Sequence, residues 1–179
     1  IPMLQCLEPD RDEQRSSVNR FDVRPAIPDQ SPSVKAVGIF GQLTGSRADL
    51  ILPDDVETPT TAWSVGMREK LLAAVGEFNA ILKPGGEIMF LGTPQTEESI
   101  YNKLAQRAYD VRIWPARYPE KPVKYGDHLA PVILEGCGDS VGQPTDPGRF
   151  SEMDLLERET SYGRSAFALQ FQLDTSLSD

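Results

Sequence analysis

Two short apolar runs, separated by a helical pattern, organise the middle of the chain. The first run is Leu50-Ile51-Leu52 and the second covers residues 87–91. Short apolar runs without alternation are typical of strands that are buried on both faces of a parallel sheet. Between them, apolar residues recur at helical spacing from Met67 to Leu82, and the Pro- and Gly-rich residues 83–86 predict the end of that helix.

Elements on either side of these runs complete an alternating pattern. A polar, Pro-containing segment at residues 8–33 predicts loops, and the β-branched residues at 34–40 predict a strand after it. Thr96 is a candidate N-cap for a helix that follows the second run, and residues 111–114 alternate like a strand. This order of strands and helices predicts an α/β layered fold with a parallel sheet and right-handed crossovers.

The last third of the chain differs in composition. Residues 115–150 contain six Pro and five Gly, which predicts a long connection. A Ser-x-x-Asp capping box at residues 151–154 predicts a short helix, and Gly163 is a candidate for its end. Residues 167–173 fit both strand alternation and a helical face, so this pattern leaves both structures open.

Composition and charge exclude several classes of protein. The 179 residues are 39% hydrophobic and 25% charged, as in folded globular chains rather than disordered ones. The formal net charge of -9 argues against this segment wrapping DNA by itself. The single histidine, His128, excludes a His-based triad or a multi-His zinc site within the chain. Cys6 and Cys137 are not in metal-ligand spacing, so we expect reduced thiols.

The sequence predicts no membrane partner. No apolar run approaches the roughly 20 residues that a transmembrane helix needs. The first residues lack the basic and apolar regions of a secretory signal. The chain starts without Met and stops without an obvious end signal, so we expect both ends to be cut from a longer protein.

Adjacent carboxylates follow the first apolar run, at Asp54 and Asp55, with Glu57 close behind. An apolar strand that delivers carboxylates at its carboxyl end is what a magnesium–nucleotide site needs. One carboxylate would bind Mg²⁺, directly or through water, and the next would polarise the water that attacks the γ-phosphate. The same residues are also compatible with a simple acidic turn after a strand.

The second apolar run ends in Gly92, Thr93, Pro94 and Gln95. A small hydroxyl residue and an amide at a strand end could contact the γ-phosphate and position water, although a turn with a helix cap has the same residues. Two strands joined by one helix would lie side by side in a parallel sheet. The sequence therefore predicts that both strand ends face one nucleotide site.

Arg47 precedes the first apolar run in a Gly-Ser-Arg sequence. It is compatible with a solvated charge, with an ion pair to Asp49, or with an arginine finger that neutralises charge in a neighbouring subunit's ATP. The chain contains no Gly-x-x-x-x-Gly-Lys-Ser/Thr sequence that would cradle the β- and γ-phosphates. We therefore expect this chain not to hydrolyse ATP by itself.

Taken together, these motifs resemble the large terminases, the DNA-packaging motors of tailed phages, and most closely the short-tailed (podovirus) type. Residues 41–57 are similar to the family's Walker B region, and residues 91–101 are similar to its coupling motif and the helix that follows. Residues 112–119 and 155–174 are also similar, so the resemblance runs through most of the chain after about Ser31.

The resemblance implies roles for the candidate residues. Asp54 would be the metal carboxylate, and Asp55 would stand at the position of the catalytic base. Because Asp55 is one methylene shorter than the usual Glu, Glu57 is an alternative base. Gly92 and Thr93, with Gln95, would contact the nucleotide and couple hydrolysis to movement. Arg47 would be a finger acting in trans, and ATP and Mg²⁺ would be the ligands.

The resemblance also implies an architecture. Residues 1–115 would form the second half of a RecA-like P-loop ATPase core of the additional-strand type, without its phosphate-binding loop. Residues 116–179 would form a lid or linker subdomain, in which the family favours a helix at 167–173. The nuclease of the family would lie beyond Asp179.

The whole protein would form a homo-oligomeric ring that binds double-stranded DNA, the portal protein and the small terminase subunit. It would work in the host cytoplasm, transiently docked on the viral procapsid. Two alternatives stay open: another nucleic-acid-stimulated P-loop ATPase of the helicase type, and a non-catalytic prophage remnant that serves as an interaction domain.

Overall fold

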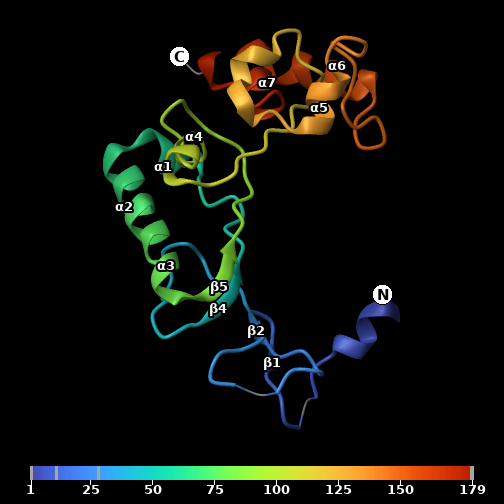
Figure 1. Cartoon of the computed structure of the whole chain (residues 1–179). Coiled ribbons are helices and arrows are strands. Elements are labelled where there is room, and N and C mark those ends of the chain that lie inside the picture. The colour runs from blue at the N-terminus through green and yellow to red at the C-terminus, as the bar shows by residue number, and fades with distance from the viewer. Residues whose placement is uncertain (1, 11, 28, 178–179) are drawn as a thin grey trace. The chain divides into compact units, whose positions relative to one another are not determined.

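The computed structural model describes residues 2–10, 12–27 and 29–177. They form two compact units. Unit 1 contains the chain up to Pro53 together with residues 71–89, and unit 2 contains residues 54–70 and 90 onwards. The strands of the described residues lie in unit 1, and helices occur in both units, so the chain has the predicted mixed α/β class (Figure 1). The boundary predicted after residue 115 stays a prediction.

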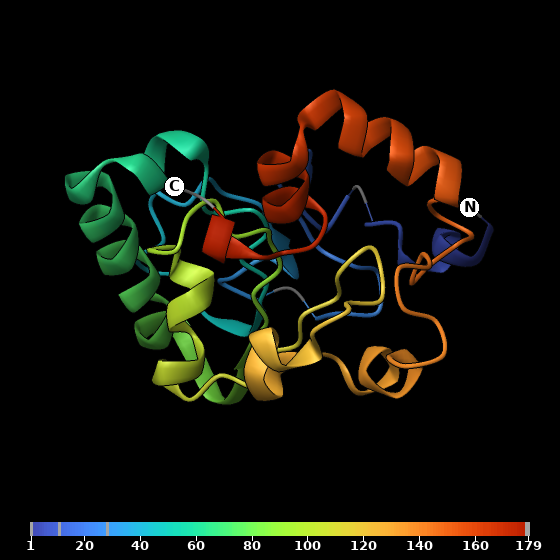
Figure 2. The same ribbon diagram turned by 90° about the horizontal axis from the view of Figure 1, so that it is seen from above.

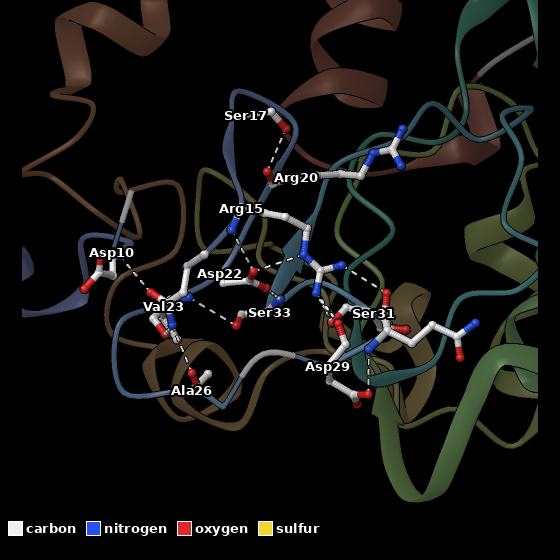
Figure 3. A network of polar contacts seen from close by, with 12 residues as sticks. Asp10, Arg15, Ser17, Arg20, Asp22, Val23, Ala26, Asp29, Ser31 and Ser33 are labelled. Carbon is white, nitrogen blue, oxygen red and sulfur yellow. Dashed lines mark hydrogen bonds and ion pairs between the residues drawn. The ribbon is translucent and has the colours of Figure 1, made fainter. Parts of the chain in front are cut away.

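The N-terminal part of unit 1 is built on short strands and polar contacts. After the 3-10 helix η1 (Pro2–Leu7), the strands β1 (Ser16–Ser17), β2 (Arg20–Phe21) and β3 (Val34–Lys35) pair antiparallel in that order. The predicted loop at residues 8–33 therefore contains two short strands, and the predicted strand at 34–40 is only two residues long. Hydrogen bonds around a buried carboxylate order this segment, and hydrophobic periodicity does not detect such contacts (Figure 3).

The parallel strand pair that the apolar runs predicted is present. β4 (Ala48–Ile51) pairs with β5 (Leu82–Ile88), with Leu50 opposite Glu87 and Ile51 opposite Ile88. An irregularity in β5 accommodates Gly85, whose φ is 80°. The Pro- and Gly-rich residues 83–86 thus lie inside a strand. The helix ends just before them, at Ile81, as predicted, but these residues form a bulge in a strand and not a turn between helix and strand.

The helix predicted from 67 to 82 is divided into two. α1 (Pro59–Trp63) begins at a capping box between Thr58 and Thr61 and precedes α2 (Val65–Gly76) and α3 (Phe78–Ile81). The expected periodicity is visible in the side chains that are buried along α2 and α3: Leu71, Val75, Phe78 and Ile81. The helical stretch ends at Ile81, immediately before β5.

In unit 2, Ser99 rather than Thr96 begins the helix after the second apolar run. The Ser99 hydroxyl accepts a hydrogen bond from the Tyr101 N–H at the start of α4 (Ile100–Lys103), and the 3-10 helix η2 (Ala105–Arg107) follows. The predicted cap at Thr96 was wrong, because residues 93–98 are taken up by the turn that leaves the strand.

Residues 111–137 form a small apolar cluster instead of a strand and a loop. Ile113 makes a single parallel bridge to Leu129, so the strand predicted at 111–114 is absent. Within the predicted loop, the 3-10 helix η3 (Pro122–His128) and α5 (Pro131–Gly136) are formed. Their buried side chains pack together in one cluster: Tyr125, Leu129, Ala130 and Ile133.

The C-terminal helices confirm the capping predictions. α6 (Glu152–Tyr162) begins at the Ser151–Asp154 capping box, and its C-cap is Gly163, with φ 77°. The chain bends there into α7 (Arg164–Gln170), which precedes η4 (Thr175–Leu177) (Figure 2). Residues 167–173 are therefore mostly helical, as the family resemblance implied. None of the helices in the described ranges is long and apolar enough to cross a membrane.

Candidate functional site

The two strand ends that carry the candidate residues are neighbours. Beyond β4 and β5 the backbone pairing continues, because Asp54 forms a parallel bridge with Leu91. The Asp55 N–H also donates to the Leu91 carbonyl oxygen at 3.0 Å. The acidic segment and the segment that begins at Gly92 thus leave the strands side by side, which confirms the predicted adjacency of the two ends.

Asp54 and Asp55 are exposed, and within the described part of the chain neither carboxylate makes a hydrogen bond or an ion pair. Asp55 has a φ of 45°, in the left-handed region that few non-glycine residues adopt. Such backbone conformations cost about 1 kcal/mol or more, and they are concentrated at functional sites. Aspartate is one of the few non-glycine residues that adopt this region, so the turn at Asp55 is compatible with its sequence.

Glu57 has a different environment from the two aspartates. Its side chain is buried, with 4% exposure. One carboxylate oxygen accepts a hydrogen bond from the Gln95 N–H at 3.1 Å, and the other accepts from the Ile100 N–H at 2.9 Å. Glu57 thus ties the acidic segment to the turn after the second strand and to the first residue of α4. A buried carboxylate is stable in this position because both oxygens have donors.

Thr93 and Gln95 are half-buried, and Gln95 makes the more extensive contacts. The Gln95 side-chain amide donates to the Thr93 carbonyl oxygen at 3.2 Å. The Gln95 side-chain oxygen accepts from the Gln170 amide of α7 at 3.3 Å. The second strand end is therefore held by Glu57 on one side and in contact with α7 on the other.

Tyr101 is a residue of this site that sequence reasoning missed. Its hydroxyl donates to the Leu91 carbonyl oxygen at 3.3 Å, and its ring lies so close to Gly92 that a Cβ at that position would overlap it. Burial, together with the negative charges of Asp55 and Glu57, raises the pKa of Tyr101 to about 12. The close packing on Gly92 gives a structural reason for glycine there, separate from any ligand contact.

Arg47 lies in unit 1, directly before β4. Its side chain is exposed, and within the described part of the chain it donates one hydrogen bond, to the neighbouring Ser46 carbonyl oxygen at 3.5 Å. The ion pair with Asp49 that the sequence left open is absent, because Asp49 is bound by Lys83 at 2.9 Å. Among the ion pairs of the described residues, none includes Arg47.

The donors at the strand ends suit a nucleotide-bound magnesium ion better than a metal held by protein alone. No group of three or more His, Cys, Asp or Glu side chains within the described ranges could hold a metal ion. Magnesium commonly uses one or two carboxylates, with phosphate oxygens and water completing its ligands. An exposed carboxylate without a protein partner, such as Asp54, fits that requirement.

Glu57→Gln tests the clamp that the buried carboxylate forms. Glutamine can accept one of the two N–H groups, but it places its own amide against the other. We expect the loss of about 1–3 kcal/mol of local stability, as for an unpaired buried polar group. In hydrogen-exchange measurements on the whole protein, this corresponds to a loss of protection of about fivefold to 150-fold at the Gln95 and Ile100 amides.

The same substitution at the exposed residue Glu69 on α2 provides a matched control. Surface substitutions of this kind usually change stability by less than about 0.5 kcal/mol. Unchanged protection at both amides in Glu57→Gln would contradict the clamp.

The fold and the site define a mixed α/β protein with polar and acidic side chains at the adjoining ends of two parallel strands. No family model matches the chain. It is 52% identical along its whole length to the large terminase subunit of Enterobacteria phage T3, and it spans 32% of the length of that protein. The resemblance to the large terminases that the motifs predicted is confirmed by this similarity.

Proposed function

We propose that this chain is the second half of the ATPase core of a large terminase, which drives viral double-stranded DNA into a procapsid. The observation that carries the proposal is the adjacency of the Asp54–Asp55 end and the Gly92–Gln95 end on two paired parallel strands. Ligands of open α/β sheets bind at the carboxyl ends of such strands. In this proposal the sheet is part of a RecA-like P-loop fold.

Asp54 and Asp55 divide the chemistry of ATP hydrolysis between them. Asp54 is the metal carboxylate, and bound Mg²⁺ would neutralise charge on the phosphates. Asp55 is the base that orients and deprotonates the attacking water. The geometry favours Asp55 over Glu57 for this role, because both oxygens of Glu57 already accept backbone hydrogen bonds while the carboxylate of Asp55 is exposed.

The second strand end responds to the nucleotide in this mechanism. Thr93 and the backbone at Gly92 contact the γ-phosphate. When the phosphate is cleaved, the resulting movement of this turn reaches α7 through the side-chain contact between Gln95 and Gln170. Glu57 is a positioning residue that holds this turn beside the acidic end. The support for these roles is that Glu57, Gln95 and the Thr93 carbonyl oxygen are joined by hydrogen bonds within unit 2.

Arg47 acts on the ATP of a neighbouring subunit. An arginine finger must present a guanidinium that its own subunit does not neutralise. The exposed side chain of Arg47, which has no carboxylate partner among the described residues, meets that requirement. The proposal therefore needs a ring of subunits in which one subunit's Arg47 faces the next subunit's nucleotide.

The remaining properties belong to the whole protein. It binds the portal protein and the small terminase subunit, and it docks on the procapsid in the host cytoplasm. Its phosphate-binding loop and its nuclease lie outside the residues of this chain, and residues 116–179 act as the lid or linker between motor and nuclease.

A packaging assay tests the proposal against the helicase alternative. The whole protein, with procapsids, double-stranded DNA and Mg-ATP, is expected to bring DNA into a nuclease-protected state. A forked duplex with a labelled strand serves as the parallel substrate, and we expect no ATP-dependent strand release from it. Strand release without protected DNA would instead support a helicase, and the absence of both activities would support a non-catalytic remnant.

A further inference from the structure

Arg47 ends a loop that is attached to the neighbouring segment by three hydrogen bonds. The Arg47 N–H donates to the Ser31 hydroxyl at 3.2 Å. The Lys35 ammonium donates to the Gln42 carbonyl oxygen at 3.2 Å and to the Ser46 hydroxyl at 2.8 Å. These contacts hold both ends of the loop, and one of them acts directly on the backbone of Arg47.

The segment that supplies Ser31 is itself bound by the Arg15 guanidinium (Figure 3). Arg15 donates to three successive backbone carbonyl oxygens, those of Asp29, Gln30 and Ser31. An arginine fork of this kind restrains a backbone more strongly than a single contact, because its donors are fixed in one plane.

Asp22 fixes both Arg15 and Ser33, which flank the segment that contains Ser31. Its side chain is almost fully buried, and it accepts hydrogen bonds from the Arg15 N–H at 2.9 Å, from Arg15 Nε at 3.0 Å and from the Ser33 N–H at 3.0 Å. The backbone N–H of Arg15, followed by its guanidinium and the Ser33 N–H, lowers the pKa of Asp22 against the opposing effect of burial. The carboxylate and the guanidinium therefore stay charged and paired at neutral pH.

The Arg47 side chain is less restrained than its backbone. It is exposed, and among the described residues its hydrogen-bond partner is the adjacent Ser46 carbonyl oxygen, at the limit of hydrogen-bond distance. Gly45, with φ 81°, makes the turn that precedes it. A residue that must reach another molecule gains from this arrangement, because the backbone is ordered in advance and only the side chain has to find its target.

We propose that Ser31 and Lys35, supported by the Arg15–Asp22 pair, are positioning residues that hold Arg47 ready to enter the ATP site of a neighbouring subunit. This inference rests on the proposed function. It assigns a role to the polar N-terminal segment, although none of the predicted catalytic motifs lies in that segment.

The test removes the three loop contacts while leaving Arg47 in place. Ser31→Ala is combined with Lys35→Met in the whole protein, and DNA-stimulated ATP hydrolysis is measured. We expect kcat to fall about tenfold or more with KM for ATP little changed, because a finger acts on the transition state and displacement by about 1 Å is costly. Ser31→Thr, which keeps the hydroxyl, should stay near wild type, and Lys121→Met is the control for loss of an exposed lysine.

Mixed rings separate positioning from a folding defect. Subunits with Asp54→Ala cannot hydrolyse ATP, but they carry an intact Arg47 loop. Added to the Ser31→Ala, Lys35→Met subunits, they should restore turnover, since the nucleotide site of the latter is unaltered. An unfolded subunit would not be restored in this way.

Two results would overturn the inference while leaving the proposed function standing. One is wild-type kcat in the Ser31→Ala, Lys35→Met protein. The other concerns mixing with Asp54→Ala subunits. It is a failure of these subunits to restore the kcat of the Ser31→Ala, Lys35→Met protein, while they do restore the kcat of Arg47→Ala. If Arg47→Ala itself is not restored, the finger is wrong, and the positioning role is wrong with it.

Discussion

Whole protein that carries Asp54→Ala is expected to lose ATP hydrolysis while keeping its fold. Metal ions stabilise the charge that develops on transferring phosphoryl groups by several kcal/mol, so we expect kcat to fall about a thousandfold or more. The exposure of Asp54 and its lack of a protein partner in the described residues mean that its removal breaks no contact of the fold. Steady-state hydrolysis over a range of Mg²⁺ concentrations measures the effect.

Asp49→Ala is the matched control for this experiment. Asp49 lies on β4, is exposed, and forms a surface ion pair with Lys83. Exposed pairs of this kind contribute about 0–1 kcal/mol, so turnover should stay near wild type. If Asp54→Ala retains turnover within about tenfold of the control, a difference of about 1.4 kcal/mol, the assignment of Asp54 as the metal carboxylate fails.

Asp55→Asn extends the same experiment to the proposed base. Asparagine tolerates the left-handed backbone conformation of Asp55, so this substitution removes the charge without adding strain at φ 45°. Loss of turnover in Asp55→Asn, with a folded protein, would separate the chemistry of the carboxylate from its backbone role.

Rings made only of Arg47→Ala subunits are expected to be inactive, and mixing them with Asp54→Ala subunits should restore hydrolysis. Arginine fingers contribute about a thousandfold or more to kcat. In a mixed ring, an Asp54→Ala subunit supplies Arg47 to a neighbour whose own carboxylates are intact. With equal amounts and independent interfaces, about a quarter of the interfaces combine the two correctly, since a head-to-tail ring places different surfaces in contact.

Hydrolysis by each protein alone and by their mixture measures this effect. Arg24→Ala, which removes an exposed arginine of the same unit, should stay active by itself. Arg47→Lys should not replace the arginine, because lysine lacks the planar fork that binds phosphate oxygens. Mixtures no more active than their components would exclude a finger in trans.

Local sequence was sufficient for several features of this chain. The apolar runs at 50–52 and 87–91 located the paired strands. The burial on both faces that these runs predicted is wrong, because about half of the surface of their large apolar side chains is exposed: Leu50, Leu52, Met89 and Leu91. The Ser151–Asp154 capping box and Gly163 located both ends of α6, because caps depend on residues next to one another in the chain. The acidic end of the first strand and the polar end of the second were expected to be adjacent, because the chain order is strand, helix, strand.

Only the tertiary structure decided how the candidate residues differ from one another. Asp55 and Glu57 are two positions apart and chemically alike, yet one is exposed and the other is buried between two amide groups more than thirty positions away in sequence. Likewise, the contacts of Ser31, Lys35 and Asp22 join segments that have no shared pattern of apolar residues. Hydrogen bonds between distant backbone groups leave no periodic trace in a sequence, so neither the clamp at Glu57 nor the support of the Arg47 loop could be predicted from it.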